Sequence, residues 1–199
     1  MTPTEKHKFR GRATRAAREL EKERTTFGHI NDGAGRRYRV GVYFLLAGDL
    51  QKAAQAFDSF YDEFPDDIGE PVFNLYSALV AFRCGETNKA RTRLFGAMLS
   101  NIFLLPFLIG QRLKAPNVWH PSNRHQESYL LEVEKFLHEP TREELNWIET
   151  ELSTRPFTIL KDGYIATFGA LNGERDLNKR VALLKQWESL QAECFPDEG

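Results

Sequence analysis

Apolar residues recur every three or four positions along most of this chain, which is the spacing of amphipathic α-helices. The spacing predicts helices over 12–26, 124–138 and 174–193. Between the last two, 157–171 also reads as helix, although Gly163 and several β-branched residues leave a strand open there. The hydrophobic pattern therefore predicts an all-α protein.

Two of the C-terminal helices carry more specific signals. Thr141 and Glu144 have the spacing of a capping box, which predicts a helix start after Pro140. The last helix is expected to turn one apolar face to the core, formed by Val181, Leu184, Trp187 and Leu190.

An internal repeat organises the middle of the chain. Residues 43–57 align with residues 80–94 at a constant offset, so that Gly48 falls on Gly85 and Asp49 on Glu86. In each copy an apolar helix ends at a glycine, which can adopt the left-handed conformation, and an acidic residue opens the next helix. The repeat predicts two successive helical hairpins.

The first copy resembles a tetratricopeptide repeat (TPR). It has Gly41-x₂-Phe44 on the first helix, Ala53-x₃-Phe57 on the second, and Pro65 at the end, in the register of that motif. Small residues stand where the two helices would cross, and phenylalanines would fill the space between them. The second copy follows the pattern more weakly, with Ala78-x₂-Ala81 and Ala90-x₃-Leu94.

The segment after the repeats, NIFLLPFLIG (101–110), is similar to the segment found after the repeats in a group of uncharacterised bacterial TPR-like proteins. The resemblance implies a TPR-like α-α superhelix with two recognisable hairpins over 35–101. Additional C-terminal helices over 102–199 are expected to pack on the repeats, so that 35–199 forms one globular unit. The resemblance implies no enzymatic activity.

The N-terminal residues 1–34 differ from the rest in charge. Residues 1–40 hold eleven Lys or Arg against five Asp or Glu, whereas the body is acidic. Residues 1–11 read as a flexible basic tail, and the helix over 12–26 offers only Leu20 and three alanines to a core, so this arm is expected to detach easily. The Gly-rich segment 28–35 reads as a linker or loop. A basic arm is also a signal for nucleic acid, since Lys and Arg neutralise phosphates, although four glutamates dilute it.

A TPR array binds extended peptides on the surface lined by the first helix of each hairpin, and the resemblance places a groove there. Arg39 and Arg83 would flank an aromatic and apolar surface, which suits a helix or apolar segment of another protein. The same residues could instead be core, covered by later helices. The predicted groove residues are Tyr38, Arg39, Val42, Leu75, Tyr76, Leu79 and Arg83.

Signals for other chemistry are weak. His120 and His125 are five residues apart with a proline between them, which is not the spacing of a helical metal pair, so surface histidines in a capping loop are expected. Cys84 and Cys194 form no disulfide framework or zinc motif, and the first residues lack the apolar stretch of a signal peptide. We therefore expect a cytoplasmic protein with no catalytic residue, metal or cofactor.

These patterns favour a non-catalytic scaffold or adaptor that binds a peptide or helix of another protein. The first alternative is a nucleic-acid-associated factor that uses the basic arm. The second is an enzyme with an unrecognised site of Asp, Glu and His residues. No apolar run is long enough to span a bilayer, so no membrane role is expected.

Overall fold

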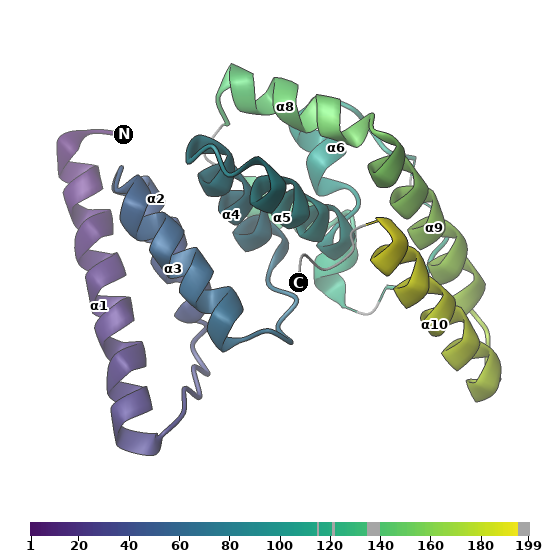
Figure 1. Ribbon diagram of the computed structural model, residues 1–199, viewed down its shortest axis with the longest axis horizontal. Helices are drawn as coiled ribbons and strands as arrows, with labels where there is room; N and C mark the ends of the chain where they lie inside the picture. The colour runs from purple at the N-terminus through teal and green to yellow at the C-terminus, as the bar shows by residue number, and fades with distance from the viewer. Residues whose placement is uncertain (115, 121, 135–139, 195–199) are drawn as a thin grey trace. The chain divides into compact units, whose positions relative to one another are not determined.

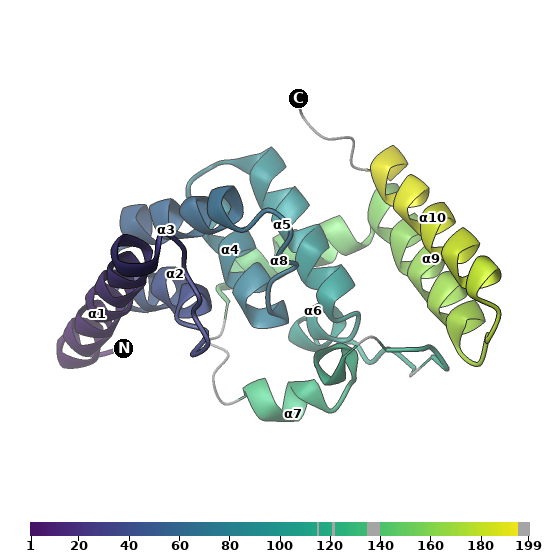
Figure 2. The ribbon, with the colours of Figure 1, turned by 90° about the horizontal axis from the view of Figure 1, so that it is seen from below.

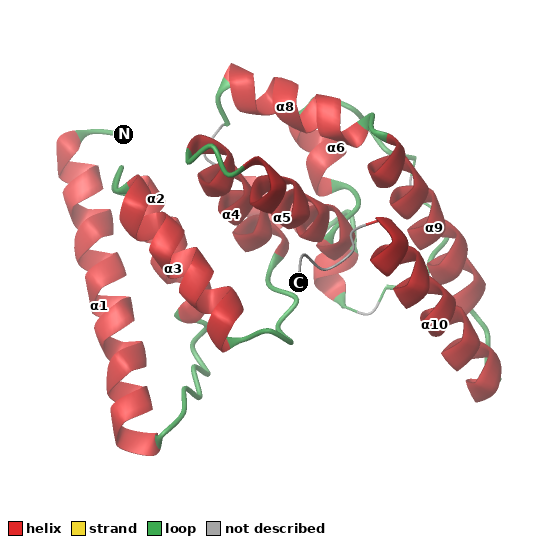
Figure 3. Ribbon diagram, viewed as in Figure 1, coloured by secondary structure: helices red, strands yellow, loops and turns green. Residues whose placement is uncertain are grey.

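A computed structural model describes residues 1–114, 116–120, 122–134 and 140–194, and the described residues form helices joined by loops. About 73 % of the chain is helical and no strand occurs among the described residues, which confirms the all-α prediction (Figure 3). The chain divides into two compact units, Met1–Leu94 and Phe95–Gly199.

Unit 1 contains the N-terminal helix, the first hairpin and part of the second, whose last helix, α5, runs across the boundary into unit 2 (Figure 1). In unit 1, α1 packs against α2, and α2 and α3 both pack against α4. The helix bounds are α1 Pro3–Phe27, α2 Arg37–Leu46, α3 Leu50–Glu63, α4 Pro71–Arg83 and α5 Thr87–Ser100.

The repeat predicted both helix stops correctly. Gly48 and Gly85 have φ values of +74° and +77° and end α2 and α4 in the left-handed conformation. The Asp49 side chain then accepts a hydrogen bond from the backbone N–H of Lys52, 3.3 Å away, and so caps α3. Gly41 faces the ring of Phe57 so closely that an added Cβ would lie 2.9 Å from it, as its predicted place at a helix crossing requires.

The N-terminal segment corrects two expectations. Residues 1–11 are not a flexible tail, because Thr2 and Glu5 form a capping box and Pro3 opens a 25-residue helix. That helix also packs more firmly than its four predicted apolar residues indicated. Phe9 contacts the ring of Tyr43 at 5.8 Å, and Ala13 is fully buried.

The Gly-rich segment 28–35 is a loop, as predicted, and hydrogen bonds define its course. Glu23 of α1 accepts the backbone N–H of Asp32 at 2.9 Å. Asp32 is buried and in turn accepts the N–H groups of Arg36 and Arg37 at 2.6 and 2.8 Å, which satisfies the first free donors of α2. The loop thus fixes how α1 leads into α2.

A polar cluster joins the two hairpins within unit 1. The guanidinium of Arg93, on α5, lies 2.5 Å from the Asp58 carboxylate of α3 and stacks over the ring of Tyr61 at 4.7 Å. Lys89 binds the same carboxylate at 3.3 Å. Arg93 is only 9 % exposed, so its guanidinium loses most of its hydration. The Asp58 carboxylate and the Tyr61 ring offset the free-energy cost of that loss.

Unit 2 contains the remaining helices, and α9 and α10 lie side by side in both ribbon views (Figures 1 and 2). Their contact is close at Gly163, where an added Cβ would clash with the Leu190 side chain. The bounds are α6 Leu104–Leu108, a 3₁₀ turn at Asn123–His125, α7 Tyr129–Val133, α8 Arg142–Leu152, α9 Arg155–Leu171 and α10 Leu177–Cys194.

Three predictions for this unit meet different outcomes. The capping box of Thr141 and Glu144 is present at the start of α8, and 157–171 is helix rather than strand. The helix predicted over 124–138 begins only at Tyr129, and the end of that prediction, 135–138, lies outside the described residues. The buried Asn101 side chain explains the late start, because it donates hydrogen bonds to the carbonyls of Arg124 and Gln126 and holds them in a loop.

The predicted core face of the last helix is only partly correct. Trp187 is buried among the rings of Tyr164 and Phe168, at 5.9 and 6.1 Å. Val181, in contrast, is 51 % exposed, and Leu184 is also exposed. Trp187 and Leu190 meet α9 at Gly163. At about 100° of rotation per residue, Val181 lies on the side of the helix opposite to Leu190, so the four residues cannot share one buried face.

Candidate functional site

Unit 1 has a cleft of about 370 Å³ between α1 and α3, with α2 as its floor. We call it the α1–α3 cleft. Clefts of this size fall within the range that protein binding sites use for a small ligand or a large anchoring side chain. Its main lining residues are Leu20 and Arg24 from α1, Val40 and Phe44 from α2, and Ala56 and Phe60 from α3.

The floor of the cleft is apolar because the inner faces of three helices meet there. Val40, Phe44 and Phe60 are buried, while Leu20 and Ala56 are half-buried and form the walls. A residue on α3 lies over this floor when it is one helical turn from Phe60, as Ala56 is. The small side chain of Ala56 leaves the cleft open at this position.

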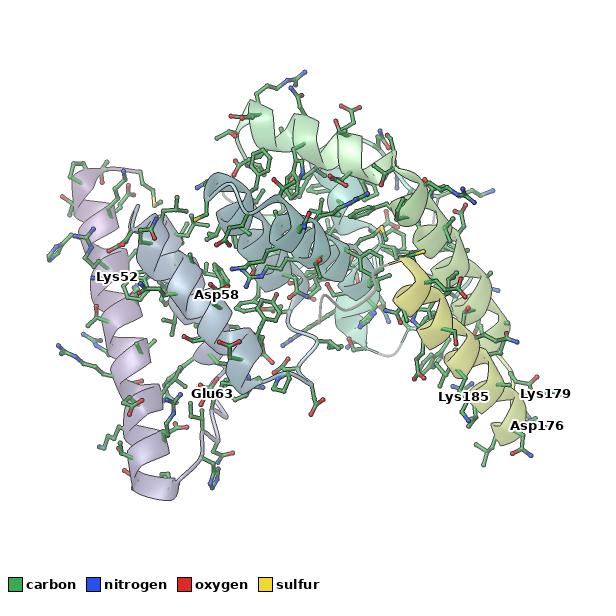
Figure 4. All side chains as sticks on the ribbon, in the orientation of Figure 1. Lys52, Asp58, Glu63, Asp176, Lys179 and Lys185 are labelled. Carbon is green, nitrogen blue, oxygen red and sulfur yellow. The ribbon has the colours of Figure 1, made fainter. Side chains whose placement is uncertain are left out.

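Charged side chains form the rim. Arg24 of α1 reaches across the cleft to Glu63 of α3 and also pairs with Glu21 at 3.4 Å. On α3, the ammonium of Lys52 lies 5.7 Å from the centre of the Phe44 ring, and Figure 4 shows Lys52 and Glu63 along this helix. The rim pairs are substantially exposed, so opening them costs little free energy.

One end of the cleft is fixed by Arg37. Its guanidinium lies over the rings of Tyr38 and Phe64, at 4.8 and 5.0 Å, and donates to the Asp67 carboxylate at 2.9 Å. The Tyr38 hydroxyl donates to the same carboxylate at 2.7 Å, and burial together with that hydrogen bond raises the pKa of Tyr38. The Nε of Arg37 is itself buried, so these contacts hold the guanidinium in place at this end of the cleft.

The residues of the predicted groove lie on α2 and α4, which do pack side by side. Tyr38 and Val42 are half-buried, and Arg39 and Arg83 are exposed. Leu75, Tyr76 and Leu79 are only 1 %, 3 % and 1 % exposed and offer no surface to a partner in this structure. The groove as a binding surface stays a prediction.

The sequence pattern did not point to the α1–α3 cleft. Its existence depends on α1 lying against α2, and α1 was expected to contribute little to the core. The spacing of Phe9, Ala13, Ala16 and Leu20 was the available signal, because these residues form one continuous stripe along the helix. Only Phe9, in the segment expected to be a tail, was missing from the predicted stripe.

The histidine loop has a different environment from the one expected. His125 is buried, not at the surface, and its Nδ1 lies 3.5 Å from the Tyr164 hydroxyl. Burial lowers the pKa values of His120 and His125, which favours neutral imidazoles, and it raises the pKa of Tyr164 to about 12. Within the described ranges no group of three or more His, Cys, Asp or Glu residues is placed to hold a metal ion.

Comparison of the chain with protein-family profiles, curated proteins and solved structures gives no match. In the part of the chain that the structure describes, no helix is both long and apolar enough to cross a membrane. The candidate site is therefore defined by the contacts of the α1–α3 cleft itself.

Proposed function

We propose that this chain is a non-catalytic protein-interaction module, a TPR-like scaffold whose α1–α3 cleft binds a segment of another protein. The observation that carries the proposal is the α1–α3 cleft itself, a space of about 370 Å³ that is lined by half-buried Leu20 and Ala56 over a buried apolar base and is surrounded by exposed charges. Sites of this kind take an apolar anchor in the centre and polar contacts at the rim.

The helical arrangement supports the TPR-like part of the proposal. Both copies of the repeat end their first helix at a left-handed glycine. Equivalent small residues, Ala53 and Ala90, are fully buried on the second helices. A TPR hairpin needs small side chains at these positions, which supports the proposal.

The chemistry of the cleft indicates its occupant. A volume of about 370 Å³ accommodates one large apolar side chain, such as Trp, Phe or Leu, rather than an extended strand. Three cationic residues, Lys52, Arg24 and Arg37, outnumber the two carboxylates among the lining residues, Glu21 and Glu63, so the cleft complements a carboxylate or carbonyl next to the anchor. The proposed partner is therefore a short segment with an apolar anchor beside an acidic residue.

Filling the cleft tests the proposal. Ala56→Trp places an indole over the floor, whereas Gln51→Trp places the same group on an exposed position of α3 that does not line the cleft. Peptides selected from a displayed library against the full chain are expected to contain the anchor and an acidic neighbour. They should bind Ala56→Trp at least about tenfold more weakly, as expected when an anchor pocket is lost, and Gln51→Trp like the parent.

Two further measurements make the test specific. Hydrogen exchange with bound peptide should show protection in segments 17–24 and 52–63, which line the cleft. Affinity purification from the native host with the parent and both variants should yield a protein that only Ala56→Trp fails to capture. Equal binding by Ala56→Trp, or protection confined to other segments, would contradict the proposal.

A further inference from the structure

The face of α1 opposite to its buried stripe is strongly basic. Ala13 and Ala16 are buried against the rest of unit 1, and α1 forms the edge of that unit in Figure 1. With about 100° of rotation per residue, the opposite face carries four exposed basic side chains, which we call the basic row. They are His7, Arg15, Arg18 and Lys22.

The glutamates that dilute the positive charge in the sequence are engaged by the protein's own groups. Glu5 accepts the backbone N–H of Thr2 in the capping box. Glu19 and Glu23 both pair with Arg36, at 2.6 and 3.1 Å. The fold therefore directs much of the negative charge of α1 to intramolecular partners.

Glu21 is also paired, with Arg24 at 3.4 Å, beside the α1–α3 cleft. The basic row, in contrast, makes no ion pair with any residue that the structure describes. The positive charge of the basic row is thus available to an external anion. The face that carries the row is more positive than the composition of α1 indicates, because the glutamates of this helix are paired elsewhere.

The spacing of the row suits a chain of phosphates. Residues 7 to 22 span about 22 Å at the helical rise of about 1.5 Å per residue. Gly11 lies in the middle of this face with nothing near the position of an added Cβ, and a hollow of about 460 Å³ lies over it, with Arg15, Arg18 and Lys22 around it. A polyanion can approach the helix backbone at Gly11 and meet successive cationic groups.

We propose that the basic row binds the phosphate backbone of duplex DNA. Apart from the single imidazole of His7, the row has no aromatic side chain on which successive bases of a single strand could stack, and it has no apolar side chain that could enter a lipid bilayer. An α-helix fits the major groove of B-form DNA, whereas the major groove of duplex RNA is too narrow. This activity is separate from the α1–α3 cleft and does not rest on the proposed function.

Charge-removing variants of the full chain test this proposal against a fluorescent 20-base-pair DNA duplex. The row variant is Arg15→Gln, Arg18→Gln, Lys22→Gln. The matched control removes three exposed basic side chains from the region of α10, two of which Figure 4 labels, with Arg175→Gln, Lys179→Gln, Lys185→Gln. Glutamine keeps a good helix propensity, so circular dichroism of both variants should match the parent.

The parent is expected to bind with an affinity that falls steeply with salt, because binding releases counterions. The row variant should lose at least about tenfold in affinity, and the slope of log affinity against log salt should decrease by roughly 2–3, since each lost phosphate contact removes about 0.9. The α10 control should bind like the parent.

Other outcomes overturn the proposal. A parent that does not bind duplex DNA, or a row variant that binds with unchanged affinity and slope, removes the assignment. An equal loss in the α10 control would show that net charge, rather than this face, determines binding. Tighter binding of duplex RNA, polyglutamate or anionic phospholipid vesicles than of duplex DNA would assign the row to that other partner instead.

Discussion

The first and second hairpins bury side chains of different size at equivalent positions. In the first, Gly41 faces Phe57, and the two groups are in such close contact that a Cβ on Gly41 would meet the ring. The second hairpin has Ala78 and Leu94 at these positions, and both are fully buried. Compared with the first hairpin, the second has a larger residue on its first helix, Ala in place of Gly, and a smaller residue on its second helix, Leu in place of Phe.

The two copies of the repeat thus differ in residue type at these positions, while the summed size of the two side chains is similar. Judged by motif letters, the second hairpin is a weak match, since it lacks the glycine and the phenylalanine. Judged by size, the pair Ala and Leu replaces the pair Gly and Phe, and close packing requires such compensation. The hairpins also differ in their neighbours, because α1 packs on α2 of the first hairpin.

Removal of α1 tests the difference in neighbours, since only the first hairpin is covered by this helix, and it should have the largest effect on stability. Deletion of residues 1–27 uncovers Val40, Tyr43 and Phe44 and removes the burial of Phe9 and Leu20. We expect unit 1 to lose about 3–5 kcal/mol, from the apolar area exposed. Hydrogen exchange should increase over 37–63, and unchanged exchange there would show that α1 contributes no stability.

How far the sequence predicts this fold depends on the range of the contacts. Local signals were sufficient for the helix stops at Gly48 and Gly85 and for the capping box of Thr141 and Glu144, because each involves neighbours within a few residues. The close contact of Gly41 was also predicted, since the repeat fixes its register.

Long-range contacts were the source of several errors, whereas the flexible tail predicted for residues 1–11 missed a local signal, the capping box of Thr2 and Glu5. The Asn101 side chain donates hydrogen bonds to carbonyls more than twenty residues away. Nothing in the sequence near Arg124 indicates that these carbonyls accept a hydrogen bond from outside a helix. The packing of Phe9 on Tyr43 likewise joins segments whose local patterns are independent. The α1–α3 cleft depends on that packing, so the candidate site could not be predicted without it.

A double-mutant cycle at Gly41 and Phe57 tests the exchange of volumes and should give intermediate effects. Gly41→Ala overpacks the ring at a cost of about 1–3 kcal/mol, offset by about 1 kcal/mol of helix propensity. Phe57→Leu leaves unfilled space and should cost about 1–2 kcal/mol. The double variant has the residue types of the second hairpin.

The double variant should therefore be more stable than the sum of the single effects predicts, by about 1 kcal/mol, as found for residues in direct contact. Urea unfolding followed by circular dichroism measures all four proteins. Strict additivity would show that the two positions are independent, and the comparison between the hairpins would then lose its basis in packing.

The smallest expected effect concerns the start of the second helix in each hairpin. Asp49 caps α3 through its hydrogen bond with the Lys52 N–H, so Asp49→Ala should cost about 1 kcal/mol. Asp49→Asn keeps an oxygen that can accept this bond and should cost less. It removes only the ion pairs of Asp49 with Arg10 at 3.9 Å and with Lys52 at 3.6 Å, and pairs with such exposed cations contribute little to stability.

The equivalent residue Glu86 is exposed and pairs with Lys89 at 2.8 Å. Glutamate is not among the favoured capping residues, so its main contribution is an exposed ion pair, and Glu86→Ala should cost less than about 0.5 kcal/mol. Salt distinguishes the two mechanisms, because screening weakens an exposed ion pair more than a capping hydrogen bond. In about 0.5 M NaCl the effect of Glu86→Ala should nearly vanish while that of Asp49→Ala persists, measured as the difference in unfolding free energy. Equal salt sensitivity at both positions would mean that Asp49 acts through its charge, and that the two hairpins start their second helices in the same way.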